Sequence, residues 1–123
     1  MLWAKFMTDC IFCKITNKEI SAEFLYEDDL VVAFHDIHPI APVHVLVIPK
    51  KHIKSVADIS EKDEKLMGRI IFTAKKIAEN LKISKEGYKL LFRVGRHGGQ
   101  EVEHIHLHLI GGVKLSESIR PLK

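Results

Sequence analysis

Hydrophobic residues in the first half of the chain form short runs that polar turns and prolines separate. Residues 24–27 and 31–34 are two such runs around an acidic pair, a pattern that predicts a β-hairpin. Residues 43–48 are rich in β-branched side chains and lie between two prolines, which predicts a further strand. Residues 10–17 favour a short helical turn. The first half is therefore predicted to be a short helix followed by three strands.

The spacing of hydrophobic residues changes to steps of three and four between residues 60 and 81. This spacing is typical of an amphipathic helix, which buries one face and exposes the other. Ser60 is a suitable N-cap, and acidic residues in the first turn complement the positive end of the helix dipole. The residues expected on or beside the buried face are Leu66, Met67, Ile70, Ile71, Ala74, Ile77, Ala78 and Leu81.

Two more strands, residues 88–94 and 103–110, are predicted after the helix, with a glycine-bearing loop at residues 95–100 between them. Strands that are neighbours in the sequence favour antiparallel pairing. The predicted fold class is therefore α+β, an antiparallel sheet with one long helix and a short N-terminal helix.

The composition supports one domain. The chain has 123 residues, of which 46% are hydrophobic, and this is enough to bury a single core. No repeat, low-complexity segment or Gly/Ser-rich linker interrupts it. We therefore expect one domain over residues 1–123, with a core of about residues 10–112 and a C-terminal tail over residues 113–123.

Charge limits the expected partners. The 19 Lys and Arg residues against 16 Asp and Glu residues give a formal charge of +3, scattered along a chain with 7% aromatic residues, which is unlike a dedicated nucleic-acid surface. A small phosphate-bearing ligand suits this balance. Residues 1–9 contain no basic leader, and no apolar run is long enough to cross a bilayer. We expect a cytoplasmic protein with no membrane or nucleic-acid partner.

Three histidines alternate with apolar residues in the last predicted strand. Alternate side chains of a strand share a face, so His104, His106 and His108 are expected on one face, opposite the core. Such a row suits two chemistries. The imidazoles can converge on one zinc ion that activates water. Alternatively, one imidazole can attack an electrophile such as phosphorus while its neighbours fix its tautomer. The residues alone leave both alternatives open.

The alternating histidines are one of several motifs that follow one another along the chain. The others are Phe34-His35-Asp36-Ile37, Ala41-Pro42-Val43-His44, Val47-Ile48-Pro49-Lys50-Lys51-His52, Gly98-Gly99-Gln100 and Gly111-Gly112. With these motifs in this order and spacing, the chain resembles the Hint branch of the histidine triad family. Almost every segment between Cys10 and Gly112 has a counterpart there.

The resemblance implies a fold and an activity. The fold is a half-barrel of antiparallel strands with the long helix packed on it, assembled as a homodimer. The activity is hydrolysis of purine nucleoside phosphoramidates, such as AMP or GMP joined to an amine. His106 would be the nucleophile, forming a nucleotidyl-histidine intermediate, and His108 would contact phosphate oxygens. His44 would orient the catalytic row that starts at His104, and Asp36 would contact the ribose. The residues that would line the base site are Phe34, His35 and Ile37.

The loop before the last strand is expected to contact the phosphate. Backbone N–H groups near Gly99 and Gln100 suit the charge on non-bridging oxygens, and glycine lets a backbone come close. Arg93 stands where many relatives carry asparagine, and it either grips the phosphate or is a solvated strand residue. Glu101, a serine in some relatives, either donates a proton to the leaving amine or caps the loop.

Two cysteines raise the question of a metal. Cys10 and Cys13 have the spacing that lets two thiolates bind one zinc ion, and a tetrahedral site needs two more ligands. His52 and His104 are candidates, because some histidine triad relatives and the related uridylyltransferases use such a set. Zinc there would be a structural cofactor, and the chemistry at His106 would need none. The alternative is two buried thiols in a small helix. A structural disulfide is not expected inside a cell.

Three functions therefore compete. The first is a hydrolase that acts through covalent His106, the second a nucleotide-binding or scaffold dimer with incidental activity, and the third a metal-dependent hydrolase with zinc on the triad histidines. The spacing of Cys10 and Cys13 favours a structural zinc ion, and with it the first function over the third.

Overall fold

The computed structural model describes residues 9–122 and contains one five-stranded antiparallel sheet in the order β1-β2-β3-β5-β4. The predictions made for the start of the chain, residues 1–8, and for residue 123 lie outside the described residues. The strands are β1 (Phe24–Glu27), β2 (Val31–His35), β3 (Val43–Pro49), β4 (Tyr88–Leu91) and β5 (Leu107–Gly111). The helices are α2 (Ile11–Thr16) and α3 (Glu64–Asn80), with 3-10 turns at Val56–Asp58 and Glu61–Asp63. The predicted α+β class is confirmed.

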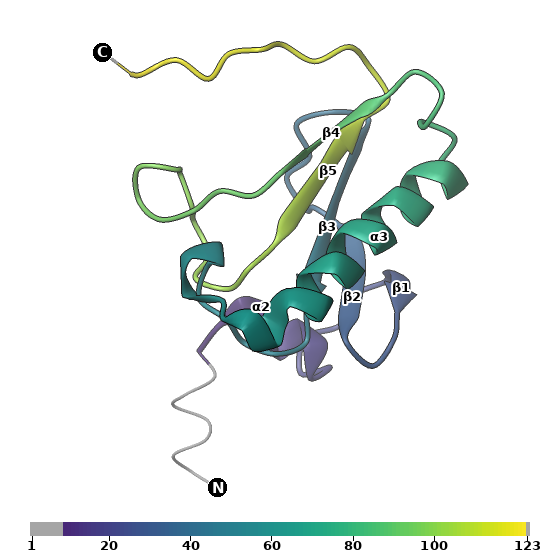
Figure 1. Cartoon of the computed structure of the whole chain (residues 1–123). Helices are drawn as coiled ribbons and strands as arrows, with labels where there is room; N and C mark the ends of the chain where they lie inside the picture. Colours follow the sequence, from purple (N-terminus) through teal and green to yellow (C-terminus); the bar gives the residue numbers. More distant parts are fainter. Residues whose placement is uncertain (1–8, 123) are drawn as a thin grey trace, which may run out of the picture.

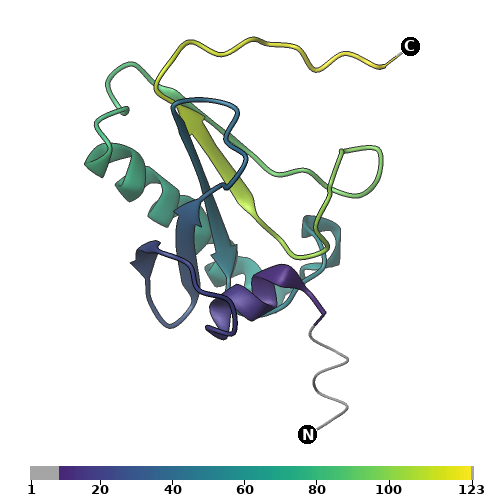
Figure 2. The same cartoon turned by 180° about the vertical axis from the view of Figure 1, so that it is seen from behind.

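The two helices cover opposite faces of the sheet, as the two views in Figures 1 and 2 show. Because side chains alternate along each strand, both faces of the sheet carry apolar residues. On one face, residues such as Ala33, Val45 and Leu107 pack with α3 in the larger core cluster. On the other face, Phe12 of α2 packs with the β2 and β3 residues Val32, Phe34, Leu46 and Ile48. None of the helices within residues 9–122 combines the length and apolarity needed to cross a membrane.

The long helix begins and ends a little inside the predicted range. Ser60 is an N-cap as predicted, but it caps the 3-10 turn Glu61–Asp63, with Asp63 completing a capping box, and α3 follows from Glu64. Five predicted positions are buried, whereas Ile71 is 48% exposed and lies outside the core. The buried predicted positions are Leu66, Ile70, Ala74, Ile77 and Ala78.

The predicted last strand, residues 103–110, is wrong at its start. β5 begins at Leu107, so His104 and His106 precede it. The partner strand β3 ends at Pro49, which has no N–H, and the Pro49 carbonyl accepts a hydrogen bond from the His104 ring at 2.8 Å. The chain bends there rather than continuing the ladder. The strand predicted at residues 88–94 is likewise shorter, since β4 ends at Leu91.

Asp28 ties the β1–β2 hairpin to α3. Its carboxylate accepts hydrogen bonds from the Leu30 and Val31 amides at 2.8 and 2.9 Å, and from the Tyr26 hydroxyl at 2.8 Å. Arg69 of α3 donates to it at 2.7 Å. Partial burial raises the pKa of this carboxyl, but the four hydrogen bonds outweigh burial and bring the pKa to about 2.

Asp28→Asn is expected to lower the free energy of unfolding at pH 7 by about 1–2 kcal/mol. Because the folded-state pKa lies below the unfolded value, this stabilisation is complete above about pH 4 and is lost as the pH falls towards 2. Urea unfolding at pH 7 and pH 2.5 measures it, with the exposed neighbour Asp29→Asn as control. An equal loss for Asp28→Asn at both pH values would contradict the ionic origin of the effect.

Candidate active site

A pocket of about 270 Å³ lies where the ends of β2, β3 and β4 approach the histidine segment. Seven of its lining residues were singled out from the sequence, and two, His38 and Ile40, were not. The pocket is lined by Asp36, His38, Ile40, His44, Arg93, Gly99, Glu101, His106 and His108.

His106 is a buried imidazole whose tautomer is fixed by its own chain. Its Nδ1–H donates to the His104 carbonyl at 2.8 Å, which leaves Nε2 as the nitrogen with a free lone pair. Phe12 of α2 packs edge-on against the ring, with ring centroids 5.1 Å apart. Burial lowers the pKa of His106, the His104 hydrogen bond raises it, and the charge of Arg93 lowers it further. His106 is therefore a neutral, oriented imidazole on the pocket wall.

His44 and His108 form a hydrogen-bonded pair beside His106. The Ile40 amide donates to His44 Nδ1 at 3.2 Å, so the His44 proton is on Nε2, which lies 2.9 Å from His108 Nδ1. Asp36 Oδ2 lies 3.4 Å from the same Nε2. Burial lowers the pKa of His108 to about 4, and the neighbouring His106 and Arg93 act in the same direction. His108 thus carries one proton, on the nitrogen that faces the pocket.

Hydrogen bonds and a glycine with a positive φ fix the conformation of the loop between β4 and β5. The Gln100 side chain accepts from the Gly95 amide and donates to the carbonyls of Lys54 and Val102 at 2.7–2.9 Å. The Gly99 and Gln100 amides, predicted to face phosphate, donate to loop carbonyls instead, both at 3.1 Å. Gly99 has a positive φ of 79°. Gln100 therefore positions the loop and is not among the pocket-lining residues.

The residues expected at a base site are divided between the core and the surface. Phe34 is buried against Phe12 with ring centroids 6.0 Å apart, whereas His35 is exposed and Ile37 is 85% exposed. None of these three is among the residues that line the pocket. Two groups of the site were not predicted from the sequence: the Ile40 amide, which fixes the His44 tautomer, and Phe12, which packs against His106. A backbone donor leaves no trace in the sequence, but the place of Phe12 between the two cysteines was a signal available there.

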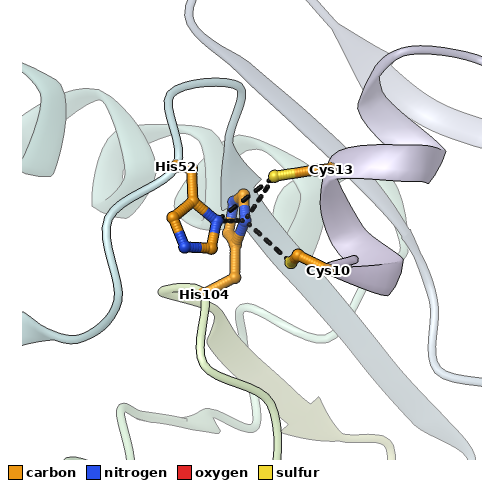
Figure 3. Close-up of side chains that lie close together, drawn as sticks. All are labelled: Cys10, Cys13, His52 and His104. Carbon is orange, nitrogen blue, oxygen red and sulfur yellow. Dashed lines mark hydrogen bonds between the residues drawn. The ribbon is translucent and has the colours of Figure 1, made fainter. Parts of the chain in front are cut away.

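Cys10, Cys13, His52 and His104 converge, as Figure 3 shows, with one ligand atom from each residue within 4.8 Å of the others. Two come from α2 and its N-cap, one from the loop after β3, and one from the bend before β5. His104 Nε2–H donates to the Pro49 carbonyl, so His104 Nδ1 is free to bind a metal. Burial, with Cys10 nearby, raises the pKa of Cys13 to about 11, an arrangement that a cation would relieve. Two sulfur and two nitrogen donors fit zinc.

The three triad histidines do not share a metal position. Within residues 9–122, the groups able to hold a metal are the cysteine-histidine cluster and Asp36, His44 and His108. His104 is turned towards the cysteines, and His106 Nδ1 is occupied by a carbonyl. The His44–His108 hydrogen bond uses the nitrogens that the second group would offer. This arrangement disfavours the metal-dependent hydrolase.

A buried histidine with a fixed tautomer, next to a hydrogen-bonded histidine pair on an open antiparallel sheet, is the arrangement expected of the histidine triad class. A family model for the HIT domain matches residues 17–115, and the chain belongs to this family. The purine nucleoside phosphoramidase of Escherichia coli strain K12 is 51% identical over 104 residues, which are 85% of this chain and 87% of that protein. The expected membership of the histidine triad family is confirmed.

Solved structures agree with this assignment. The crystal structure of a HIT family hydrolase from Legionella pneumophila Philadelphia 1 has a TM-score of 0.87 and 48% identity, covering 89% of this chain and 97% of that one. A histidine triad protein from Clostridium difficile has a TM-score of 0.87 and 44% identity, covering 90% of this chain and 96% of that one. The open sheet with one long helix is thus the fold of these relatives.

Proposed function

We propose that this chain is a hydrolase of purine nucleoside phosphoramidates and related nucleotide conjugates, acting through covalent His106. The observation that carries the proposal is the free Nε2 of neutral His106, fixed by the His104 carbonyl on the wall of a pocket of about 270 Å³. The name of the Escherichia coli relative, purine nucleoside phosphoramidase, supports this substrate class.

Each step has a residue beside it. His106 Nε2 attacks phosphorus, the P–N bond breaks, and the departing nitrogen takes a proton to leave as a neutral amine. Glu101, on the pocket wall, is the proposed source of that proton. Water then attacks the nucleotidyl-histidine and gives a proton to the Glu101 carboxylate, the P–N bond to His106 breaks, and the nucleoside monophosphate departs. His108 Nε2–H stabilises the charge on the phosphoryl oxygens.

The remaining nucleotide contacts are proposed from the motifs. Asp36 contacts the ribose, since it lies on the pocket wall with its carboxylate held by the His38 amide at 2.8 Å. Arg93 and Gly99 meet the phosphate, and Gln100 supports their loop. The residues that we place around the base, by the family resemblance, are Phe34, His35 and Ile37.

We propose that Cys10, Cys13, His52 and His104 hold a structural zinc ion and that the chemistry needs no cofactor. Zinc would supply a closed tetrahedral brace between α2, the loop after β3 and the bend before β5. The two thiols are free, which suits the expected cytoplasmic location. A homodimer is proposed as well, supported by the position of β4 at the edge of the sheet.

The chain is expected to convert AMP joined to a primary amine into AMP and the free amine. Quenching turnover with an alkaline denaturant, and keeping the digest alkaline so that a histidine-phosphorus bond survives, should leave one AMP on the peptide that contains His106, because that bond forms before water enters. Mass spectrometry of the digested protein measures this adduct. Tight binding of the conjugate with no release of amine would instead support the nucleotide-binding scaffold.

A further inference from the structure

Arg93 and His108 meet in the pocket as two hydrogen-bond donors. The Ile40 amide donates to His44, and His44 donates to His108 Nδ1, so the His108 proton is on Nε2. Arg93 Nη1, which has only N–H groups, lies 3.2 Å from this same nitrogen. Two donors at this distance cannot satisfy each other. They converge on a position that only an acceptor can fill.

Arg93 is also the permanent cation of the pocket. No ion pair found within residues 9–122 includes it. His44 Nδ1 accepts from the Ile40 amide, and His108 Nδ1 accepts from His44 Nε2, so each of these two lining rings carries one proton and no charge. The lining carboxylate of Asp36 would repel an anion. An anionic ligand therefore depends on Arg93 for its charge complement.

The stem of Arg93 is held in place by the loop. A Cβ atom at Gly99 would lie 3.5 Å from Arg93 Cδ and 3.8 Å from Nε, so the guanidinium stem rests against the glycine. Gln100 pins the same loop to the Lys54 and Val102 carbonyls. The loop thus supports the stem of Arg93 and leaves its Nη1 beside His108 Nε2.

We propose that Arg93 and His108 form a two-donor clamp that makes this pocket select a dianionic terminal phosphate over a singly charged phosphodiester or phosphoramidate. The inference rests on the proposed function and adds a charge preference to it. A second negative charge gains from the fixed charge of Arg93, whereas a neutral donor at this position would not distinguish the two. The nucleoside monophosphate product is therefore held more tightly than the conjugate and inhibits turnover.

Three adenosine ligands test the clamp by their charge. AMP is dianionic near pH 7.5, its phosphate methyl ester is monoanionic, and adenosine 5′-sulfamate is a neutral isostere. Calorimetric affinities for the wild-type protein are expected to fall in that order. Arg93→Gln should weaken AMP binding about 10–100-fold and change sulfamate binding less than about threefold, so the affinities of the three ligands should become more nearly equal. Arg93→Lys, which keeps the charge but loses the fork, should lie between.

Arg96→Gln is the matched control, since Arg96 is exposed, three residues away and not among the pocket-lining residues. It should keep the wild-type series. An equal loss of all three ligands in Arg93→Gln, or no loss, overturns the clamp while leaving the hydrolase proposal intact. Failure of the wild-type protein to bind any of the ligands overturns both proposals. Conjugate hydrolysis that AMP fails to inhibit overturns the clamp alone.

Discussion

His106→Ala is expected to reduce phosphoramidate hydrolysis by about 10⁴-fold or more, with nucleotide affinity changed by less than about tenfold. The reason is the geometry of the buried ring. Nε2 of His106 is the unprotonated nitrogen on the pocket wall. His44 and His108 are hydrogen-bonded to each other, and this bond does not depend on His106. Removing the nucleophile leaves the phosphate contacts in place. Steady-state kinetics and calorimetric titration with AMP measure the two effects separately.

His97→Ala is a suitable control for this prediction, because His97 is exposed in the loop after β4 and is not among the pocket-lining residues. It should retain wild-type turnover. Thermal melts of both variants test folding, since His106 packs against Phe12 and its loss leaves a small cavity. A folded His106→Ala protein that turns over at a rate close to wild type would exclude the covalent mechanism.

The alternation of three histidines predicted the packing of the residues between them better than it predicted the backbone. The apolar residues between them, Ile105 and Leu107, do enter the core, as a strand face requires. Yet His104 and His106 lie before β5, because Pro49 ends the ladder and its carbonyl accepts a hydrogen bond from the His104 ring. Periodicity reports which side chains share a face and is silent about where a partner strand stops pairing.

Contacts made by backbone groups could not be predicted. The tautomers of the site depend on the amide of Ile40 and on the carbonyl of His104, and any residue type offers these groups. Similarly, helical spacing placed Ile71 near the buried face, but the sheet covers a narrower stripe and leaves it 48% exposed. The cluster of Cys10, Cys13, His52 and His104 was predicted because the spacing of the two cysteines is visible in the sequence and the family resemblance supplied the two histidines.

The row of triad histidines and the proposed zinc site share one residue, which would give a bound metal a specific structural role. His104 offers Nδ1 to the cysteine cluster, and its carbonyl holds the Nδ1–H of His106. Phe12, between the cysteines, packs against both rings, with centroids 5.8 Å from His104 and 5.1 Å from His106. A metal at the cluster would therefore brace the nucleophile without touching the substrate.

Removal of the metal is consequently expected to act through stability. For a protein saturated with zinc at 100–1,000 times the dissociation constant, linkage gives about 3–4 kcal/mol, or roughly 10 °C or more in melting temperature. Cys13→Ser should show this loss and purify without zinc, because it removes a buried ligand. Metal analysis and thermal melts measure both, and cobalt substitution should give a thiolate-to-metal absorption band in the wild-type protein only.

Ile11→Ser, on the exposed side of the same helix, should keep its metal and most of its stability, and it separates ligand loss from helix damage. A chelator provides the decisive comparison at a temperature where the zinc-free protein remains folded. Hydrolysis should continue there and fall only as the melt begins, since His106 needs no metal to attack phosphorus. Immediate loss of hydrolysis, with the fold intact by circular dichroism, would show that a metal-bound water and not His106 attacks phosphorus.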